Sequence, residues 1–460
     1  MYTAISAVKF FLLISLGLMF LLGQGWLVVG PILQGSLIIK KRHIPLLQEI
    51  PLMLMSGLIL NYGMILIFQS LTISLAAGGI LSICGLCCWG VNTFRYQPRQ
   101  RLTPASMKKW IGAFFVCSLF LSPIFTIPLI DWDARSIWFF HAKMIYTAGS
   151  MGFSAGWQHP SVVFSHADYP NLVPALAAQV AHVLGFWNEY IPKASLFFML
   201  VPAVGWLFTF ARRSFSFTIL LFLFPVSFNP WLWNGYMDGV FALYFSVAML
   251  LLGRYIKSLQ PIDMVSSLSC LIVLLYIKNE GVLALLSGLC SMILVHLLLK
   301  NKTLFSRSGF LQEWKSYLAG FLGLLPFGIW GLYKQEWDLW NDLGIGTLPS
   351  LLRISSRLMD GSYQIIFQNI YRQIEGALMM LGLLGFAFAA QNKSIARESL
   401  PALFAAGIYC LGMVFVYLLT PNDLGWHLQV SIKRTMLPVI GCIYMGSFYI
   451  LDALENILAA

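Results

Sequence analysis

Charged residues are scarce in this chain. Lys, Arg, Asp and Glu make up 10% of its 460 residues, and hydrophobic residues make up 59%, whereas a typical soluble protein is roughly 25% charged. Many apolar runs are close to the ~20 residues that a helix needs to cross a bilayer. Such spans must be helical, because lipid cannot satisfy an open backbone. The composition therefore excludes an ordinary soluble fold and predicts an all-α, polytopic membrane protein.

Signals for a disulfide framework, a cleaved leader and nucleic-acid binding are also lacking. The eight cysteines lie in apolar runs, and Cys84-x-x-Cys87-Cys88 has no companion histidine or second pair. We interpret them as small buried hydrophobes. Lys9 is the only early charge before an apolar run to Ile39, which is too long for a signal peptide and predicts a retained span. The net charge of +11 comes from short basic loops between apolar runs, so we expect contact with anionic lipid and no nucleic acid.

The apolar runs predict about thirteen transmembrane helices in one integral membrane domain, residues 1–460. A three-span N-terminal extension (1–109) precedes a core (110–460) with a large outer loop, 131–192. A further apolar stretch, Leu172 to Phe186, follows Tyr169-Pro170-Asn171 and is expected to be a juxtamembrane or re-entrant helix. The expected spans are roughly 8–38, 48–69, 71–92, 110–130, 193–211, 215–229, 238–253, 263–277, 281–299, 316–333, 375–390, 399–419 and 435–452.

Basic residues define the predicted orientation. Most of the 29 Lys and Arg residues fall in one alternating set of loops, which the positive-inside tendency assigns to the cytoplasmic side. The opposite loops hold most of the acidic residues and five of the seven histidines. We therefore expect the functional side chains to face outward.

Asp131 and Asp133 stand at the mouth of the predicted span 110–130. Carboxylates there are costly unless water, a cation or a substrate meets them. One can act as a general base, or the two can share a divalent cation. The alternative is structural, with Asp133 capping a helix that begins at Ala134. That helix would place Arg135, Trp138 and Ala142 on one face, as a lipid head-group site or a plain interfacial anchor.

Four other polar segments carry candidate residues. His166 and Asp168 lie in a polar turn and could join a metal or substrate shell. Asp238 opens an apolar span, and Lys278-Asn279-Glu280 forms a hairpin that either binds substrate or is a local salt bridge. Outward-facing Lys433 and Arg434 break the positive-inside trend. They indicate an anionic ligand or, alternatively, snorkelling to head groups.

Five motifs follow one another along the chain: Trp132-Asp133-Ala134 with Trp138 and Lys143, Tyr169-Pro170-x-x-x-Pro174, Gly235-Tyr236-x-Asp238, Lys278-Asn279-Glu280-Gly281, and Asp423-x-x-x-His427 with Arg434. In this order they resemble the GT-C superfamily of polyprenyl-phosphate-sugar-dependent membrane glycosyltransferases, in particular bacterial relatives of the protein mannosyltransferase and aminoarabinose transferase group. The sequence departs from that pattern in having three spans before the helix that leads to the first large loop. It also lacks the double-proline form of the Tyr-Pro motif and a large C-terminal soluble domain.

The resemblance implies a GT-C-like core and an inverting sugar transfer at the outer face of a bacterial inner (cytoplasmic) membrane. The donor would be a polyprenyl-phosphate sugar and the acceptor a glycan, lipid or protein. Asp133 would be catalytic, with Asp131 its less certain neighbour. No cofactor is certain, and Mg²⁺ or Mn²⁺ on Asp131, Asp133 and His166 is an open alternative. The expected substrate- or lipid-phosphate-binding residues are Arg434, Lys143, Arg135, His427, Tyr169, Asp238, Glu280 and Lys278.

Other membrane functions compete with this hypothesis. A transporter or flippase of lipid-linked glycans also needs many spans, although transporters often carry internal repeats and charges midway along helices. A glycan polymerase or ligase would use large outer loops with arginine and histidine. A non-catalytic membrane assembly factor is the third alternative.

Overall fold

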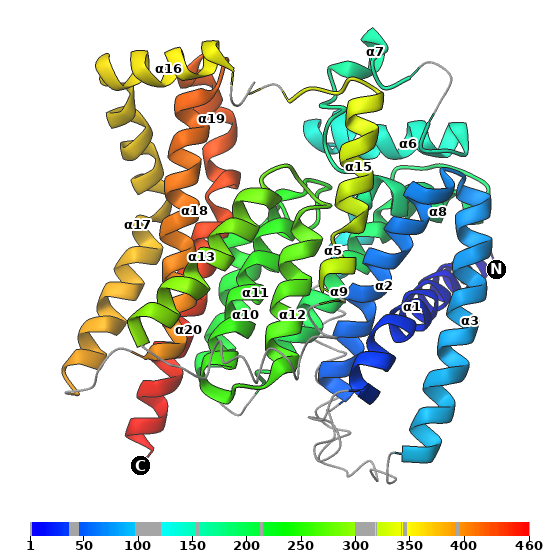
Figure 1. Ribbon diagram of the computed structural model, residues 1–460, viewed down its shortest axis with the longest axis horizontal. Helices are drawn as coiled ribbons and strands as arrows, with labels where there is room; N and C mark the ends of the chain where they lie inside the picture. Colours follow the sequence, from blue (N-terminus) through cyan, green and yellow to red (C-terminus); the bar gives the residue numbers. More distant parts are fainter. Residues whose placement is uncertain are drawn as a thin grey trace.

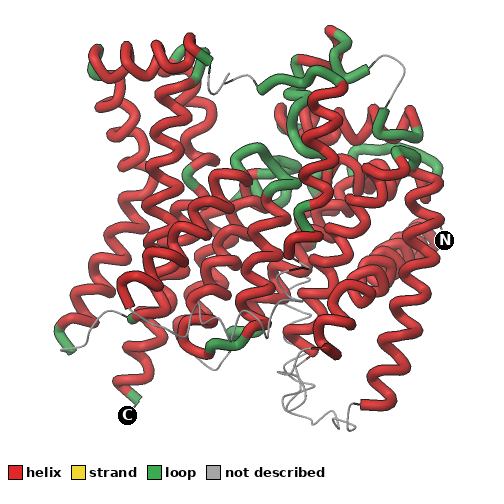
Figure 2. The backbone as a smooth tube through the Cα atoms, viewed as in Figure 1, coloured by secondary structure: helices red, strands yellow, loops and turns green. Residues whose placement is uncertain are grey.

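The computed structural model describes residues 2–35, 46–96, 121–152, 156–211, 215–299, 318, 320–341, 343, 347–391 and 396–459. Within these residues the chain is helical and has no strand (Figure 2). Nine of the described helices are long and apolar enough to cross a membrane. This confirms the predicted helical, multi-pass architecture. The predicted span 110–130 lies mostly outside the described residues, as does the beginning of 316–333.

The helices form two groups that lie side by side (Figure 1). One group consists of α1 (Tyr2–Gly35), α2 (Leu46–Phe68), α3 (Leu71–Tyr96), α5 (Pro123–Thr126), a π-helix (Ala134–Trp138), α6 (Phe139–Ala148), α7 (Pro160–Val163), α8 (Leu172–Leu184), a 3-10 turn (Ile191–Lys193), α9 (Ala194–Phe208) and α15 (Leu325–Glu336). The other consists of α10 (Phe215–Phe228), α11 (Asp238–Ser258), α12 (Pro261–Leu274), α13 (Gly281–Leu299), α16 (Leu348–Met359), α17 (Ser362–Ala389), a 3-10 turn (Arg397–Ser399), α18 (Leu400–Leu419), α19 (Leu424–Thr435) and α20 (Leu437–Leu458).

Glycine lets the first two helices pack backbone against backbone. A Cβ on Gly25 would lie 1.8 Å from the carbonyl oxygen of Met53, and one on Gly57 would lie 2.1 Å from that of Leu21. Small residues at membrane helix contacts allow this close approach. Replacing either glycine would therefore force α1 and α2 apart.

Helix α2 also braces α8. Asn61 donates from Nδ2 to Oε1 of Gln179 at 2.8 Å, and the Asn171 backbone N–H donates to the Tyr62 hydroxyl at 3.1 Å. Helix α8 has 13 residues and is therefore about 20 Å long, short of the ~30 Å hydrocarbon thickness. Its length fits the predicted juxtamembrane or re-entrant helix.

The segments predicted to face outward gather at one end of the molecule, the upper end in Figure 1. There the α2–α3 turn meets the loop after α6, since Leu71 N donates to Gly149 O at 2.9 Å and Met151 N donates to Gln69 O at 2.8 Å. The turn between α11 and α12, with Arg254 near its start, lies at the opposite end. Several basic segments used for the orientation, including 36–45, 97–109 and 300–317, lie outside the described residues.

The cysteine prediction was partly wrong. Cys270 and Cys442 are buried, but Cys84, Cys87, Cys88 and Cys290 are exposed on the outer faces of α3 and α13. A membrane helix can place apolar residues outward because lipid is as apolar as the protein interior. Cys117 lies outside the described residues.

Candidate functional site

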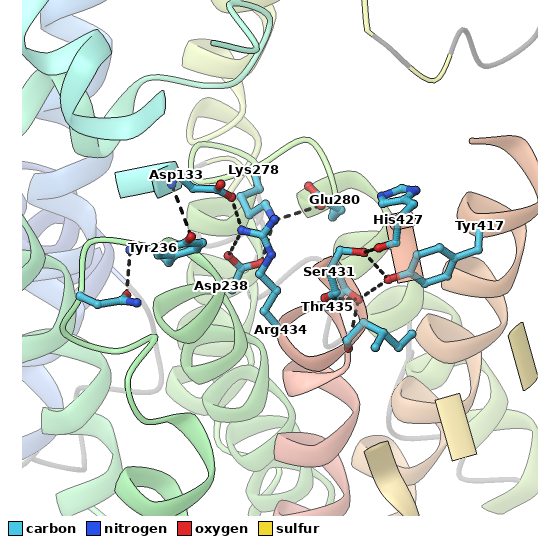
Figure 3. Close-up of polar contacts among 12 residues, drawn as sticks. Asp133, Tyr236, Asp238, Lys278, Glu280, Tyr417, His427, Ser431, Arg434 and Thr435 are labelled. Carbon is cyan, nitrogen blue, oxygen red and sulfur yellow. Dashed lines mark hydrogen bonds and ion pairs between the residues drawn. The ribbon is translucent and has the colours of Figure 1, made fainter. Parts of the chain in front are cut away.

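Five charged side chains from four separate segments meet in one cluster, which Figure 3 shows close up. We call Asp133, Asp238, Lys278, Glu280 and Arg434 the outer charge cluster. Arg434 pairs through Nη1 with Oδ2 of Asp133 and lies 3.9 Å from Oδ2 of Asp238. Lys278 Nζ lies 2.9 Å from Oδ1 of Asp238 and 3.1 Å from Oε1 of Glu280. The cluster thus joins the outer loop to the starts of α11 and α13 and to the end of α19.

A turn at Gly235 positions Tyr236, the aromatic residue that contacts the cluster. Gly235 has φ +99°, and a Cβ on it would lie 2.7 Å from that of Ala134, so only glycine fits this turn without strain. The next residue, Tyr236, is fixed by a hydrogen bond from its backbone N–H to Asn234 Oδ1 at 3.0 Å. Its ring lies 5.0 Å from the guanidinium carbon of Arg434, a cation–π contact. Its hydroxyl accepts from the Asp133 N–H at 3.4 Å.

The cluster has more carboxylates than cations. It contains three acids and two bases, and Oε2 of Glu280 is buried without a hydrogen-bond partner among the described residues. Burial alone would lower the pKa of Lys278, but the carboxylates of Asp238 and Glu280 outweigh it and raise that pKa well above its ordinary value. Burial, followed by the Asp133 carboxylate, raises the pKa of Tyr236. Lys278 is therefore charged at neutral pH, as arginine always is, and one of the three carboxylates has no matching cation within the cluster itself.

Helix α19 presents a second polar face beside the cluster. The Tyr417 hydroxyl forms hydrogen bonds with Ser431 Oγ at 2.9 Å and Thr435 Oγ1 at 2.7 Å. The imidazole of His427 lies edge-on to the Tyr417 ring, 5.2 Å between centroids, and its buried Nδ1 has no partner in the described part of the chain. Tyr417 therefore orients the helix that carries both His427 and Arg434.

The polar turn at residues 166–171 is hydrogen-bonded to the hairpin that carries Lys278 and Glu280. Asp168 accepts from Asn279 Nδ2 at 2.5 Å and from Asn341 Nδ2 at 3.1 Å, which ties the turn to the 278–280 hairpin. The Tyr169 ring stacks on both Trp138 and His166, with centroids 5.3 and 5.1 Å apart. Burial raises the pKa of Tyr169 far above its ordinary value. Asp168 thus acts as a link between loops, and Tyr169 as a packed aromatic.

The structure contradicts the structural alternative for Asp133 and the helix face expected after it. Asp133 makes no side-chain cap, because its carboxylate turns to Arg434 instead. Arg135 and Trp138 do not share a face, since residues 134–138 form a π-helix whose wider turn changes the spacing. Trp138 is buried at 2% exposure, whereas Arg135 is exposed.

The structure brings some predicted site residues together and leaves others apart. Asp133, Asp238, Lys278, Glu280 and Arg434 form the cluster, with His427 beside it. Lys143 is exposed on α6. Asp131 is half-buried and interacts electrostatically with Lys193 and Tyr236. Within the described ranges, no three His, Cys, Asp or Glu residues are placed to hold a metal ion, so Asp131, Asp133 and His166 do not form a ready-made site.

Sequence reasoning missed Tyr417 and Asn341 as parts of this region. Tyr417 lies in an apolar span, and only its place in the last turn of that span hints at a polar environment. Asn341 lies in a loop without a recognisable motif.

Comparison with protein-family models, with curated proteins and with solved structures found no match for the chain.

Proposed function

We propose that this protein is a GT-C-type glycosyltransferase that moves a sugar from a polyprenyl-phosphate donor to a cell-envelope acceptor. The single observation that carries the proposal is the pairing of Asp133 with Arg434 inside the outer charge cluster. The pair places a carboxylate, a candidate general base, beside a guanidinium, the group best suited to grip phosphate. Both come from segments that carry the family resemblance.

In the proposed reaction, an acceptor hydroxyl attacks the anomeric carbon of the donor sugar. The bond between that carbon and the phosphate oxygen breaks, and its electron pair leaves with the lipid phosphate. Asp133 takes the hydroxyl proton. Arg434, with Lys278 behind it, stabilises the charge that grows on the phosphate. A single displacement of this kind inverts the anomeric configuration.

The remaining carboxylates take other roles in the proposal. Asp238 is 4% exposed and bonded to Lys278, so it holds the two cations in position. Glu280 would repel a phosphate but can accept a hydrogen bond from a sugar hydroxyl through its unpartnered Oε2. Lys143 and Arg135, exposed near the same end, would meet anionic head groups. This end would face outward from a bacterial inner membrane.

The test is sugar transfer in membranes supplied with labelled polyprenyl-phosphate sugars. Asp133→Asn should lower transfer by about 10²-fold or more, the usual contribution of a general base. Arg434→Ala should chiefly weaken use of the lipid donor. Asp360→Asn is the matched control, because Asp360 is an exposed carboxylate at the same end, between α16 and α17. The same assay with a chelator tests a role for Mg²⁺ or Mn²⁺.

Full transfer by Asp133→Asn at normal expression would remove Asp133 from catalysis. Movement of intact lipid-linked sugar across the membrane without transfer would favour the transporter alternative.

A further inference from the structure

We propose that the Asp133–Arg434 ion pair is a resting-state contact that the donor phosphate displaces, so that the base is released only after the donor has bound. This inference rests on the proposed function and specifies how that site is regulated. It makes binding ordered, with donor first and acceptor proton transfer second. In the absence of donor, the Asp133 carboxylate would stay paired with Arg434 and could not act as the general base.

The charge count of the cluster carries the first step. Three carboxylates already surround two cations, and one carboxylate oxygen, Oε2 of Glu280, has no partner among the described residues. Adding a phosphate to this set without any change would increase an existing negative excess in a partly desolvated place, which is unfavourable. An anion can therefore bind well only if one carboxylate gives up its cation.

Asp133 is the carboxylate best placed to leave. Asp238 is buried at 4% exposure and bonded to Lys278, and Glu280 bonds to Lys278, not to Arg434. Asp133 is bonded only to Arg434 through its side chain in the described structure, and that side chain is 18% exposed. Releasing it costs one ion pair and brings it toward water.

The backbone after Asp133 offers a way to move it. Residues Ala134–Trp138 form a π-helix, closed by a hydrogen bond from Phe139 N to Ala134 O. A π-turn holds one more residue than an α-turn, and such turns are rare and concentrate at functional sites. Conversion to α-helix would rotate Asp133 by about 100° relative to α6, and so swing its carboxylate away from Arg434.

Arg434 would stay in place after the exchange. Its guanidinium lies over the Tyr236 ring at 5.0 Å and 3.9 Å from Asp238. These contacts keep the cation aimed at the position that Asp133 leaves. The phosphate then takes the place of the carboxylate, and the free carboxylate can accept the acceptor proton.

The exchange predicts an unusual sign for one variant. Binding of a C55 polyprenyl monophosphate to the full chain in nanodiscs would be measured for wild type, Asp133→Asn, Arg434→Gln and the double variant. Asp133→Asn should bind about 10-fold more tightly than wild type, because Arg434 no longer has a competing carboxylate. Arg434→Gln should bind at least 10-fold more weakly, and the double variant should lose the gain. Unphosphorylated polyprenol and Asp360→Asn serve as controls.

Each outcome bears on a separate claim. Equal or weaker binding by Asp133→Asn, while wild type prefers the phosphate to polyprenol, would overturn the exchange and leave the proposed donor intact. No preference for the phosphate in any variant would overturn the donor assignment itself. If Asp133→Asn does not fold, Asp133→Ser provides the same test, with the melting temperature of each variant recorded beside its affinity.

Discussion

Two partly buried ion pairs lie at opposite ends of the molecule, and they differ in how completely their carboxylate oxygens are hydrogen-bonded. At the lower end, Arg254 Nε and Nη2 lie 2.9 and 2.7 Å from Oδ1 of Asp263. Nη1 of Arg254 donates to Thr209 Oγ1 at 2.7 Å, and Ser258 Oγ donates to Oδ2 of Asp263 at 3.1 Å. Both carboxylate oxygens therefore accept a hydrogen bond, and each guanidinium nitrogen has an oxygen within 2.9 Å, although the buried Nη2 pairs with Oδ1 by charge and makes no hydrogen bond. Phe210 covers the guanidinium at 4.2 Å.

The outer charge cluster differs in the sequence distance between its partners and in the number of carboxylate oxygens that are paired. Asp133 and Arg434 are 301 residues apart in the sequence, whereas Arg254 and Asp263 are nine apart and close the turn between α11 and α12. Glu280 and His427 each keep a buried polar atom without a partner in the described residues. Leaving such atoms unpaired costs stability, and a bound ligand can remove that cost. We infer that the lower pair stabilises the fold, whereas the cluster is prepared for a ligand.

The largest expected loss of stability comes from breaking the Arg254–Asp263 pair. Arg254→Ala leaves the Asp263 carboxylate buried without a counter-charge, which should destabilise the protein by about 3–5 kcal/mol. Thermal unfolding of the detergent-solubilised protein measures the effect. Lys257→Ala is the control, because Lys257 is 61% exposed and lies 3.4 Å from Glu398, an arrangement worth little. A melting temperature equal to wild type in Arg254→Ala would show that hydrogen bonds to both carboxylate oxygens do not mark a structural ion pair.

His141 sharpens the comparison, because it lies in the outer loop but has both ring nitrogens partnered. Nδ1 lies 3.0 Å from Asn171 Oδ1, and Nε2 lies 2.8 Å from Ser165 Oγ. We therefore expect it to be structural, like Arg254. Burial lowers the pKa of His141 to about 4. Between pH 6.5 and 4 the unfolded chain binds a proton that the folded chain refuses, so stability is complete above pH 6.5 and falls as the pH falls, by about 3 kcal/mol in total.

Melting temperatures between pH 7.5 and 4.5 check this expectation. His141→Gln should flatten the decline, whereas His159→Gln, at an exposed histidine, should leave it unchanged. A decline that is equally steep without His141 would assign the acid sensitivity to other groups.

The helical membrane fold could be predicted because hydrophobic run length is a local property of the sequence. The runs behind α2, α3, α11, α13 and α18 correspond to helices that are long enough to cross. The count was less predictable, since α10 and α12 have 14 residues each and their length as helices depends on their neighbours. The π-helix after Asp133 could not be predicted either, because no local pattern marks a π-turn, and Ala134 packs closely against the distant Gly235.

The site was predictable in its members more than in its contacts. Charges at span ends pointed to Asp133, Asp238, Lys278, Glu280 and Arg434 because each is costly beside lipid. Periodicity could not show that Asp133 would pair with Arg434, since that contact depends on how α19 packs beside α11. It also could not separate Lys143 from the cluster, because an exposed and a buried lysine have the same local signal.

The smallest expected effect comes from comparing two variants that each replace one carboxylate by the neutral amide. Glu280→Gln removes a charge from a set with excess carboxylate, and Lys278 keeps its partner Asp238. We expect a change in unfolding free energy within about 1 kcal/mol, because the loss of one ion pair is offset by relief of the unpartnered Oε2. Asp263→Asn removes the same kind of charge from a carboxylate whose two oxygens both accept hydrogen bonds, and it should cost about 2–3 kcal/mol. Sugar transfer should show the reverse order, with Glu280→Gln impaired about 10-fold or more and Asp263→Asn close to wild type per folded molecule. An unstable but fully active Glu280→Gln would instead make the cluster a structural element, because its stabilising contacts would then exceed the cost of its unpaired atoms.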